Sequence, residues 1–265
     1  PSLLLDDGKI IGAGRYYVTI VHVLLLLAVL GVPISWKKVR GGIEYRDAYL
    51  IDNDARFVFS FVRSAIDAGA SAANYVELVS AHRDGDRWVA ELRDTDSGAV
   101  YRTTARVIVN ATGPWSDGLP HSAVKLRLTK GIHLVVDHAR LPVPDAVVVT
   151  EGKRILFAIP WAGRVVLGTT DTDYRGRPED VAVEPADTAY VLRTVNTWFP
   201  GAGLQESDVI SSWAGLRPLV ANPDGTPSDI SRAHEIRRPE TGWWDITGGK
   251  LTTYRLMAEQ AVDQV

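Results

Sequence analysis

The sequence predicts a mixed α/β protein in which a layered α/β unit is interrupted by an antiparallel sheet. Three observations predict this class. Residues 107–109, Val-Ile-Val, are apolar without alternation, as in a strand buried on both faces of a parallel sheet. From about Ser122 the strands become short, closely spaced and joined by turns, which is typical of antiparallel sheets. Residues 243–264 then run from a strand through two glycines into a helix, so the first unit resumes after the insertion.

Composition excludes several classes of function. The net charge of −3 on 265 residues gives no reason to expect a nucleic acid as partner. There is no cysteine, so disulfides, thiolate metal sites and cysteine nucleophiles are excluded. The six histidines are scattered, and His133 and His138 lack the spacing of a metal site, so we expect no bound metal.

The first half of the α/β unit begins with a helix. Asn53 or Asp54 can cap a helix that runs to about Ala68 and ends at Gly69. Three strands follow at residues 72–82, 87–94 and 100–110, and the turns between them contain Asp-Gly and Ser-Gly pairs. The third strand stops at residues 111–113, Ala-Thr-Gly, where the backbone can approach a ligand at the sheet edge.

The inserted sheet is expected to contain strands at residues 131–137, 146–151, 154–161 and 164–171. Pro185 starts a helix that Pro200 and Gly201 close. A strand follows that begins at residue 208 and is expected to end at Arg217 and Pro218. Residues 231–238 and 242–247 are expected to pair as a hairpin. The last helix comes directly after that hairpin.

The connection before the last helix, Gly-Gly-Lys, has two interpretations. Gly248 and Gly249 allow positive φ and a close ligand, and the first turn of the helix from about Leu251 carries partial positive charge. Lys250 adds a full charge, so the segment suits an anion. Alternatively, the segment is a plain β-turn-α connection in which glycine serves geometry alone.

Residues 16–36 contain no Asp, Glu, Lys or Arg and are long enough to cross a bilayer. Basic residues flank the run, as they do at membrane interfaces. Three interpretations remain open: a membrane span or anchor, a buried core segment, or a reading artefact.

Several motifs together resemble one family. GIEYRDAYLIDNDAR, NATGPW, KGIHLVV, IPWAGRVVLGTTDTDY, WAGLRPL and GGKLTTYR resemble, in this order, the FAD-dependent glycerol-3-phosphate dehydrogenases of the aerobic type. The resemblance covers the chain from about Gly41 to its last residue. It implies an incomplete Rossmann-like FAD-binding domain of the glutathione-reductase type, formed by residues 41–120 and 216–265. It also implies an inserted antiparallel substrate domain over residues 121–215, and it leaves residues 1–40 unassigned.

The chain departs from the family pattern at its start. The family opens with a GxGxxG turn that cradles the FAD pyrophosphate, whereas this chain has only a Gly-Ala-Gly at residues 12–14. The early arginine segment that contacts substrate is also missing. We therefore expect the chain to carry only part of the FAD-binding surface.

The resemblance implies oxidation of sn-glycerol 3-phosphate to dihydroxyacetone phosphate by hydride transfer to flavin N5. It implies that electrons pass to membrane quinone or to oxygen. It places the protein in the cytoplasm, peripherally on the inner face of the cell membrane, with a homodimer as a possible assembly. Two alternatives remain open: an amine or amino-acid oxidase of the same flavin architecture, and a truncated remnant without catalysis.

By resemblance, His133, Arg217 and Lys250 are the catalytic residues. A histidine near neutral pKa can accept the C2 hydroxyl proton, and the planar guanidinium of Arg217 suits a phosphate or a developing alkoxide. Whether His133 or Arg217 takes the proton stays open. Thr170 and Asp171 are expected to join Arg217 and Lys250 in binding substrate.

The FAD contacts implied by the resemblance lie on two turns. The adenosine half would meet the backbone of the Ala-Thr-Gly turn, with a further backbone contact in the strand before it. The isoalloxazine ring would meet the Gly-Gly turn and the helix start. The expected residues are Val76, Ala111, Thr112, Gly113, Gly248, Gly249, Leu251 and Thr252.

Overall fold

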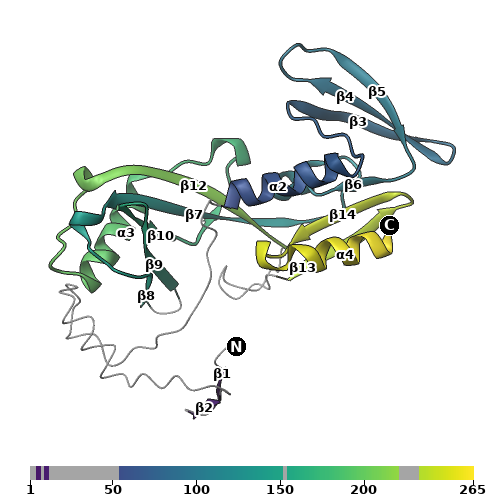
Figure 1. Cartoon of the computed structure of the whole chain (residues 1–265). Coiled ribbons are helices and arrows are strands. Elements are labelled where there is room, and N and C mark those ends of the chain that lie inside the picture. The colour runs from purple at the N-terminus through teal and green to yellow at the C-terminus, as the bar shows by residue number, and fades with distance from the viewer. Residues whose placement is uncertain (1–3, 7–8, 12–53, 152–153, 221–232) are drawn as a thin grey trace.

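The computed structural model describes residues 4–6, 9–11, 54–151, 154–220 and 233–265 (Figure 1). The short strands β1 (Leu4–Asp6) and β2 (Lys9–Ile11) pair as an antiparallel hairpin. The apolar run at residues 16–36 and the Gly-Ala-Gly segment at residues 12–14 lie outside the described residues. Within the described ranges, no helix is both long enough and apolar enough to cross a membrane.

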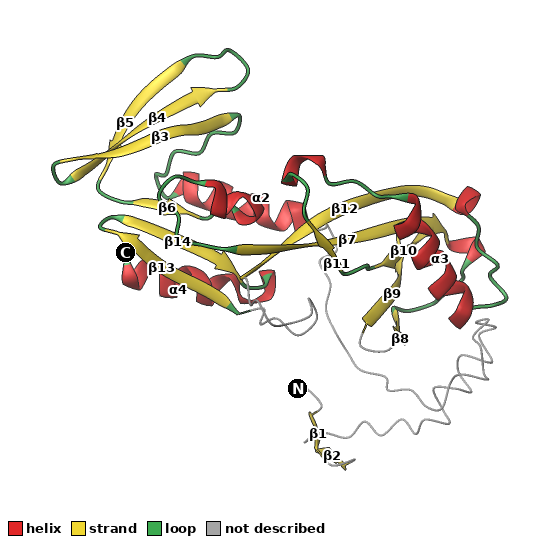
Figure 2. Cartoon of the chain, turned by 180° about the vertical axis from the view of Figure 1, so that it is seen from behind, coloured by secondary structure: helices red, strands yellow, loops and turns green. Residues whose placement is uncertain are grey.

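An antiparallel region, residues 126–220, is built around two long strands. β7 (Leu126–Asp137) pairs along its length with β12 (Val209–Val220), and the two lie side by side in both views (Figures 1 and 2). On its other side β7 pairs with β10 (Arg164–Gly168) and β11 (Thr172–Tyr174). The sheet continues through β9 (Arg154–Trp161) to β8 (Val147–Glu151). The predicted antiparallel sheet is therefore confirmed.

The two faces of β7 differ because side chains alternate along a strand. Ile132, Leu134 and Val136 are fully buried and pack in one hydrophobic core with residues of α3 (Pro185–Trp198). The odd-numbered residues lie on the opposite face, where Gly131 and His133 oppose residues of β12. One face thus supplies stability, and the other face is available for a site.

A second part, here called the α/β region, comprises residues 54–125 and 233–265. Helix α2 (Asp54–Asp67) is followed by a three-stranded antiparallel sheet of β3 (Val76–Asp84), β4 (Arg87–Asp94) and β5 (Val100–Ala105). This sheet lies at the end of the molecule remote from α3 (Figure 1). The predicted helix and the first two predicted strands are confirmed. The third, predicted as one strand over residues 100–110, is divided into β5 and the separate strand β6 (Ile108–Asn110), which belong to different sheets.

The remaining sheet returns late in the chain. β13 (His234–Glu240) and β14 (Trp243–Gly248) form the predicted hairpin, and β14 pairs in parallel with β6 (Ile108–Asn110). The short 3₁₀ turn Leu251–Thr253 then leads into α4 (Tyr254–Gln264). Parallel pairing is confirmed for residues 108–110, but the predicted burial of residues 107–109 on both faces is wrong, since Val109 is 45% exposed. Among the described strands, β6 pairs with β14 alone and is therefore an edge strand.

A buried carboxylate joins the pieces of the α/β region. Asp245 of β14 is fully buried and accepts hydrogen bonds from the Asn110 side chain of β6 at 2.8 Å and the Trp243 indole at 3.0 Å. It also accepts from the hydroxyl of Ser122 and the backbone N–H of Ala123, just before β7. Four donors from three segments satisfy this carboxylate, so it positions β6, β14 and the entry to β7.

Candidate active site

The open face of β7 and β12 carries the first cluster of predicted site residues. Cross-strand partners in an antiparallel pair share a face. His133 opposes Trp213, Gly131 opposes Gly215, and Arg217 opposes Thr129. The register therefore places His133 and Arg217 on one face, with two glycines between them that leave the intervening surface low.

The guanidinium of Arg217 is held in place from the end of β10. One nitrogen donates to the carbonyl of Thr170 at 3.2 Å and lies 3.5 Å from the carboxylate of Asp171, and the other donates to the hydroxyl of Thr169 at 3.0 Å. Gly131 makes room for it, since a Cβ there would lie 2.3 Å from an Arg217 nitrogen. The sequence argument expected Arg217 at a strand end, but β12 continues to Val220. Pro218 is tolerated there because β12 is an edge strand.

His133 is suited to accept a proton. Burial lowers the pKa of its imidazole, and the nearby positive charge of Arg217 lowers it further. The ring is therefore neutral at physiological pH, which leaves one nitrogen free to take a proton. This electrostatic pairing favours His133 over Arg217 as the base, because a guanidinium beside it stays protonated.

Thr170 and Asp171 support Arg217. Thr170 is only 2% exposed, and its hydroxyl donates to the Lys130 carbonyl while accepting from the backbone N–H of Ile132. Asp171 forms an ion pair with Arg217 at 3.5 Å. Their direct contact with substrate stays a prediction.

Lys130 is a buried cation that faces away from this site. Its ammonium pairs with Asp187 at 2.7 Å and with Glu184 at 2.8 Å, at the start of α3. Two carboxylates neutralise it, so Lys130 links the start of α3 to the core face of β7.

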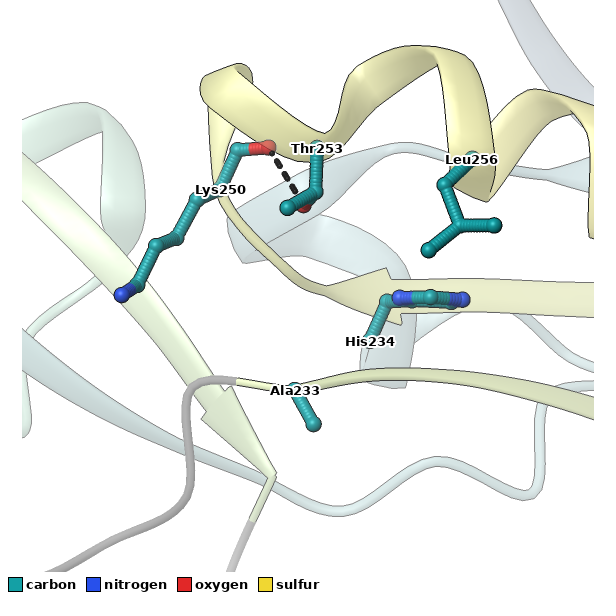
Figure 3. Close-up of a pocket in the computed structure, with 5 residues that line it drawn as sticks. All are labelled: Ala233, His234, Lys250, Thr253 and Leu256. Carbon is teal, nitrogen blue, oxygen red and sulfur yellow. Dashed lines mark hydrogen bonds between the residues drawn. The ribbon is translucent and has the colours of Figure 1, made fainter. Parts of the chain in front are cut away.

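Lys250 belongs to a second group of predicted site residues, on the Gly-Gly turn before the last helix. Gly248 and Gly249 have φ of 72° and 81°, and Lys250 precedes the 3₁₀ turn as its N-terminal flanking residue. Its carbonyl accepts from the hydroxyl of Thr253 at 3.0 Å (Figure 3). Lys250, His234 and Leu256 line an open hollow of about 370 Å³. Within it, the exposed ammonium of Lys250 points away from the other two side chains (Figure 3). Neither His133 nor Arg217 lines that hollow.

The two glycines serve packing as well as geometry. A Cβ on Gly248 would lie 2.7 Å from the carbonyl oxygen of Ala233, and one on Gly249 would lie 2.4 Å from the sulfur of Met257. Positive φ would strain any other residue at either position. Structural demands alone therefore explain both glycines, which keeps the plain connection as an alternative to a ligand turn.

The predicted FAD contacts fit an open backbone surface. Gly113 has a φ of 59°, and a Cβ there would meet nothing within 4 Å, so the turn leaves space for a bound group. Ala111 and Thr112 are exposed beside it, and the Thr112 hydroxyl donates to the Asn110 side chain at 2.8 Å. Leu251 and Thr252 are exposed in the turn before α4. Val76 opens β3, which belongs to a different sheet from β6.

The sequence did not predict two residues that shape the site and its support, Trp213 and Asp245. Trp213 lies four residues before Arg217, and alternation along β12 places both on one face with Gly215, which was a usable signal. Asp245 lies just before the motif GGKLTTYR, but three of its four donors come from segments more than 100 positions away, and no local pattern indicates them.

Comparison with known proteins identifies the family of the chain. Residues 27–261 match the family model described as FAD dependent oxidoreductase. The chain is 40% identical over 237 residues to the aerobic glycerol-3-phosphate dehydrogenase of Bacillus subtilis, covering 86% of this chain and 42% of that protein. It is 37% identical over 229 residues to a glycerol-3-phosphate dehydrogenase of Mycobacterium leprae, covering 84% of this chain and 39% of that protein.

Solved structures give the same picture. The glycerol-3-phosphate dehydrogenase of Bacillus halodurans, complexed with FAD, superposes with a TM-score of 0.77 at 35% identity, over 91% of this chain and 47% of that one. Glycine oxidase from Bacillus cereus shares the fold, with a TM-score of 0.54 at 21% identity over 77% of this chain and 52% of that one. The chain spans about two fifths of the length of the curated relatives it matches. By its match over residues 27–261, the chain belongs to the family of FAD-dependent oxidoreductases.

Proposed function

We propose that the protein oxidises sn-glycerol 3-phosphate to dihydroxyacetone phosphate with FAD as cofactor. The observation that carries the proposal is the neutral His133 beside the fixed guanidinium of Arg217 on one open face. The curated relatives at 37% and 40% identity are named glycerol-3-phosphate dehydrogenases, which supports this substrate over other polyol phosphates.

The chemistry divides between cofactor and chain. Bound FAD supplies a hydride acceptor for the hydrogen on C2 of the substrate. His133 takes the proton of the C2 hydroxyl, so the C–O bond becomes a carbonyl while charge stays balanced. Because its pKa is lowered, the imidazole is ready to accept this proton at neutral pH.

The cations of the chain hold the anionic substrate. Arg217 offers the planar donor pair that suits a phosphate or the developing alkoxide, and the Thr169 and Thr170 contacts orient that pair. Lys250 adds an ammonium at the start of the last helix, where backbone N–H groups also favour an anion. We assign Arg217 and Lys250 together to the substrate, and Thr170 and Asp171 to its surroundings.

An amine or amino-acid oxidase is the second candidate. The fold shared with glycine oxidase from Bacillus cereus favours it, because Arg217 could hold a carboxylate as readily as a phosphate. The two substrates differ in charge and in the reacting bond, so a direct comparison separates them.

The test is anaerobic mixing of the FAD-loaded protein with glycerol 3-phosphate, glycine or sarcosine, followed through the visible absorbance of the flavin. We expect glycerol 3-phosphate to bleach the flavin and the two amino acids to leave it oxidised. Bleaching by glycine or sarcosine alone would establish the oxidase instead. A preparation that stays colourless after incubation with FAD would support the non-catalytic remnant.

For the electron acceptor we propose the membrane quinone pool or oxygen, with the protein on the inner, cytoplasmic face of the membrane and a homodimer as the candidate assembly. The resemblance supports this proposal. Reoxidation of the reduced flavin by a soluble quinone in the absence of oxygen tests the first route. Carbonate washing of membranes tests attachment: release into the wash fits a peripheral protein, and retention until detergent is added contradicts it.

A further inference from the structure

We propose that Trp213 is the positioning residue for His133: its indole covers one face of the imidazole and holds the ring in the orientation from which it takes the substrate proton. The inference rests on the proposed function of His133 as the base. It adds a residue on β12 that belongs to neither the FAD contacts nor the substrate contacts described above.

The first observation is the ring geometry. The centroids of the His133 and Trp213 rings are 5.1 Å apart, and the ring planes are inclined by only 20°, so the two rings stack. The residues oppose each other across β7 and β12, where the close approach of cross-strand partners keeps such a pair together. One face of the imidazole is therefore covered by a rigid aromatic surface.

The second observation concerns the opposite neighbour of His133. Gly168 of β10 also opposes His133, and a Cβ added there would lie 2.3 Å from Cδ2 of the imidazole and 2.9 Å from Nε2. The ring thus occupies the space that a side chain at position 168 would fill. Trp213 and Gly168 together limit how far the ring can turn.

The third observation is that no hydrogen bond holds the His133 ring among the described residues. Histidines that act as bases are commonly held by a hydrogen bond from the nitrogen that does not react. Across the described part of the chain, no such bond to the His133 ring is present, whereas the His121 ring has two and the His138 ring has one. We therefore infer that packing against Trp213 and Gly168 fixes the orientation of the imidazole, as a hydrogen bond to a carboxylate or carbonyl does in other sites.

The exposure of Trp213 fits a role in the site. Its side chain is 46% exposed, although it lies on the strand next to a fully buried core. An indole that served only stability would be expected on the core face of the sheet. The ion pair of Arg217 and Asp171 lies beside His133, and the ion pairs Arg127–Asp173 and Arg164–Asp137 lie on the same face toward the two ends of β7.

The test combines nuclear magnetic resonance with kinetics in four proteins: wild type, Trp213→Ala, Trp213→Phe and Ile210→Ala. Ile210 is the matched control because it is an exposed apolar residue on the same strand, three residues before Trp213, at the bulge where β12 has no paired residue on β7. In Trp213→Ala we expect the pKa of His133 to rise, since water reaches the uncovered ring face, and its ring protons to lose the upfield shift caused by the indole. Trp213→Phe keeps a flat ring and should restore both readings.

In the FAD-loaded protein, we expect the rate of flavin reduction by glycerol 3-phosphate to fall about tenfold in Trp213→Ala, with the substrate Kd little changed, because orientation of the base affects the reaction step. The fall should be largest at low pH, where the less shielded imidazole is protonated. Trp213→Phe should recover most of the rate, and Ile210→Ala should match wild type.

Two results would overturn the proposal: unshifted His133 ring protons in the wild-type protein, which show that the stack is absent, or an unchanged His133 pKa and reduction rate in Trp213→Ala. The wild-type spectrum decides the first point even if the alanine variant does not fold. The resonance measurements need no substrate, so they stand apart from the proposed function. If glycerol 3-phosphate does not bleach wild-type flavin, that function fails while the stack is still decided.

Discussion

The antiparallel region and the α/β region bury their apolar residues very differently. Every residue of the main hydrophobic core, from Ile132 to Leu204, belongs to the antiparallel region. In the α/β region, helix α2 has no buried residue, and Val58, Phe59, Val62 and Ile66 are between 38% and 57% exposed. α2 instead contacts α4 through aromatic side chains: Phe61 stacks on Tyr254 with their ring centroids 4.4 Å apart.

The difference shows that the two regions are stabilised by different forces. The antiparallel region has the apolar burial that dominates folding free energy. The described part of the α/β region buries fewer apolar residues, and it contains the hydrogen-bonded carboxylate of Asp245 and the aromatic contact of Trp88 with Trp243. Substitutions should therefore act through packing in one region and through hydrogen bonds in the other.

The largest expected effect is a cavity in the antiparallel core. Leu134→Ala removes a fully buried side chain, and we expect the free energy of unfolding to fall by about 2–5 kcal/mol. Val62→Ala on α2 is the contrasting change, with an expected loss below about 1 kcal/mol because Val62 is 38% exposed. Denaturant titration followed by tryptophan fluorescence measures both. Equal losses would contradict the contrast between the regions.

The next effect concerns the polar network of the α/β region. Asp245→Ala leaves the donors of Asn110 and Trp243 without their acceptor, and we expect a loss of about 2–4 kcal/mol because several hydrogen bonds to one carboxylate disappear together. Asp86→Ala, at an exposed turn, should be nearly neutral. Hydrogen exchange of the β6 and β14 amides locates the loss. Faster exchange confined to β7 and β12 would show that the carboxylate does not act where its partners lie.

A smaller effect is the pH dependence of the contact between β3 and β13. His121 bonds the carboxylate of Glu240 through Nδ1 and the carbonyl of Ala81 through Nε2, each at 2.9 Å. Both partners are acceptors, so the ring must be doubly protonated to satisfy them. The hydrogen bond to Glu240 is the main reason that the pKa of His121 is raised in the folded protein.

The raised pKa of His121 determines how the free energy of unfolding changes with pH. A pKa raised on folding gives a stabilisation that is complete below the unfolded pKa of about 6.5 and is lost as pH rises through the folded value. We expect the free energy of unfolding to decline over that interval and His121→Gln to remove this part of the decline. The control is His82→Gln, at an exposed position on β3. A pH profile that His121→Gln leaves unaltered would contradict the assignment.

Local sequence signals predicted much of the fold. Caps, prolines and glycines gave α2, α3 and the β13–β14 hairpin, because these features act within a few residues of the element they bound. The burial of residues 107–109 was wrong, because burial depends on which strands lie beside them. Composition cannot supply that information.

The site was predictable in part for the same reason. His133, Arg217 and Lys250 came from a resemblance between motifs, and the strand register then showed that His133 and Arg217 share one face. The stack of His133 on Trp213 depends on the pairing of strands 80 positions apart, and so does the space that Gly131 leaves for Arg217. No single segment of the sequence contains either relation.

We propose that both regions supply a cation to one anionic substrate, Arg217 from the antiparallel region and Lys250 from the α/β region. The most direct measurement is the rate of anaerobic flavin reduction in FAD-loaded Lys250→Met, with glycerol 3-phosphate and with glycerol. Methionine keeps the length and the apolar stem of the side chain and removes its charge. The variant should still bind FAD, since the backbone donors of the turn remain.

With glycerol 3-phosphate we expect kcat/KM to fall by about two to three orders of magnitude, or about 3–4 kcal/mol, the usual loss when one charge-stabilising donor leaves a closed site. Glycerol separates two roles: its slow reaction should be unchanged if Lys250 binds the phosphate and should fall equally if Lys250 binds the reacting oxygen. An unaltered rate with glycerol 3-phosphate would contradict the claim and leave Gly-Gly-Lys as a plain connection between β14 and α4.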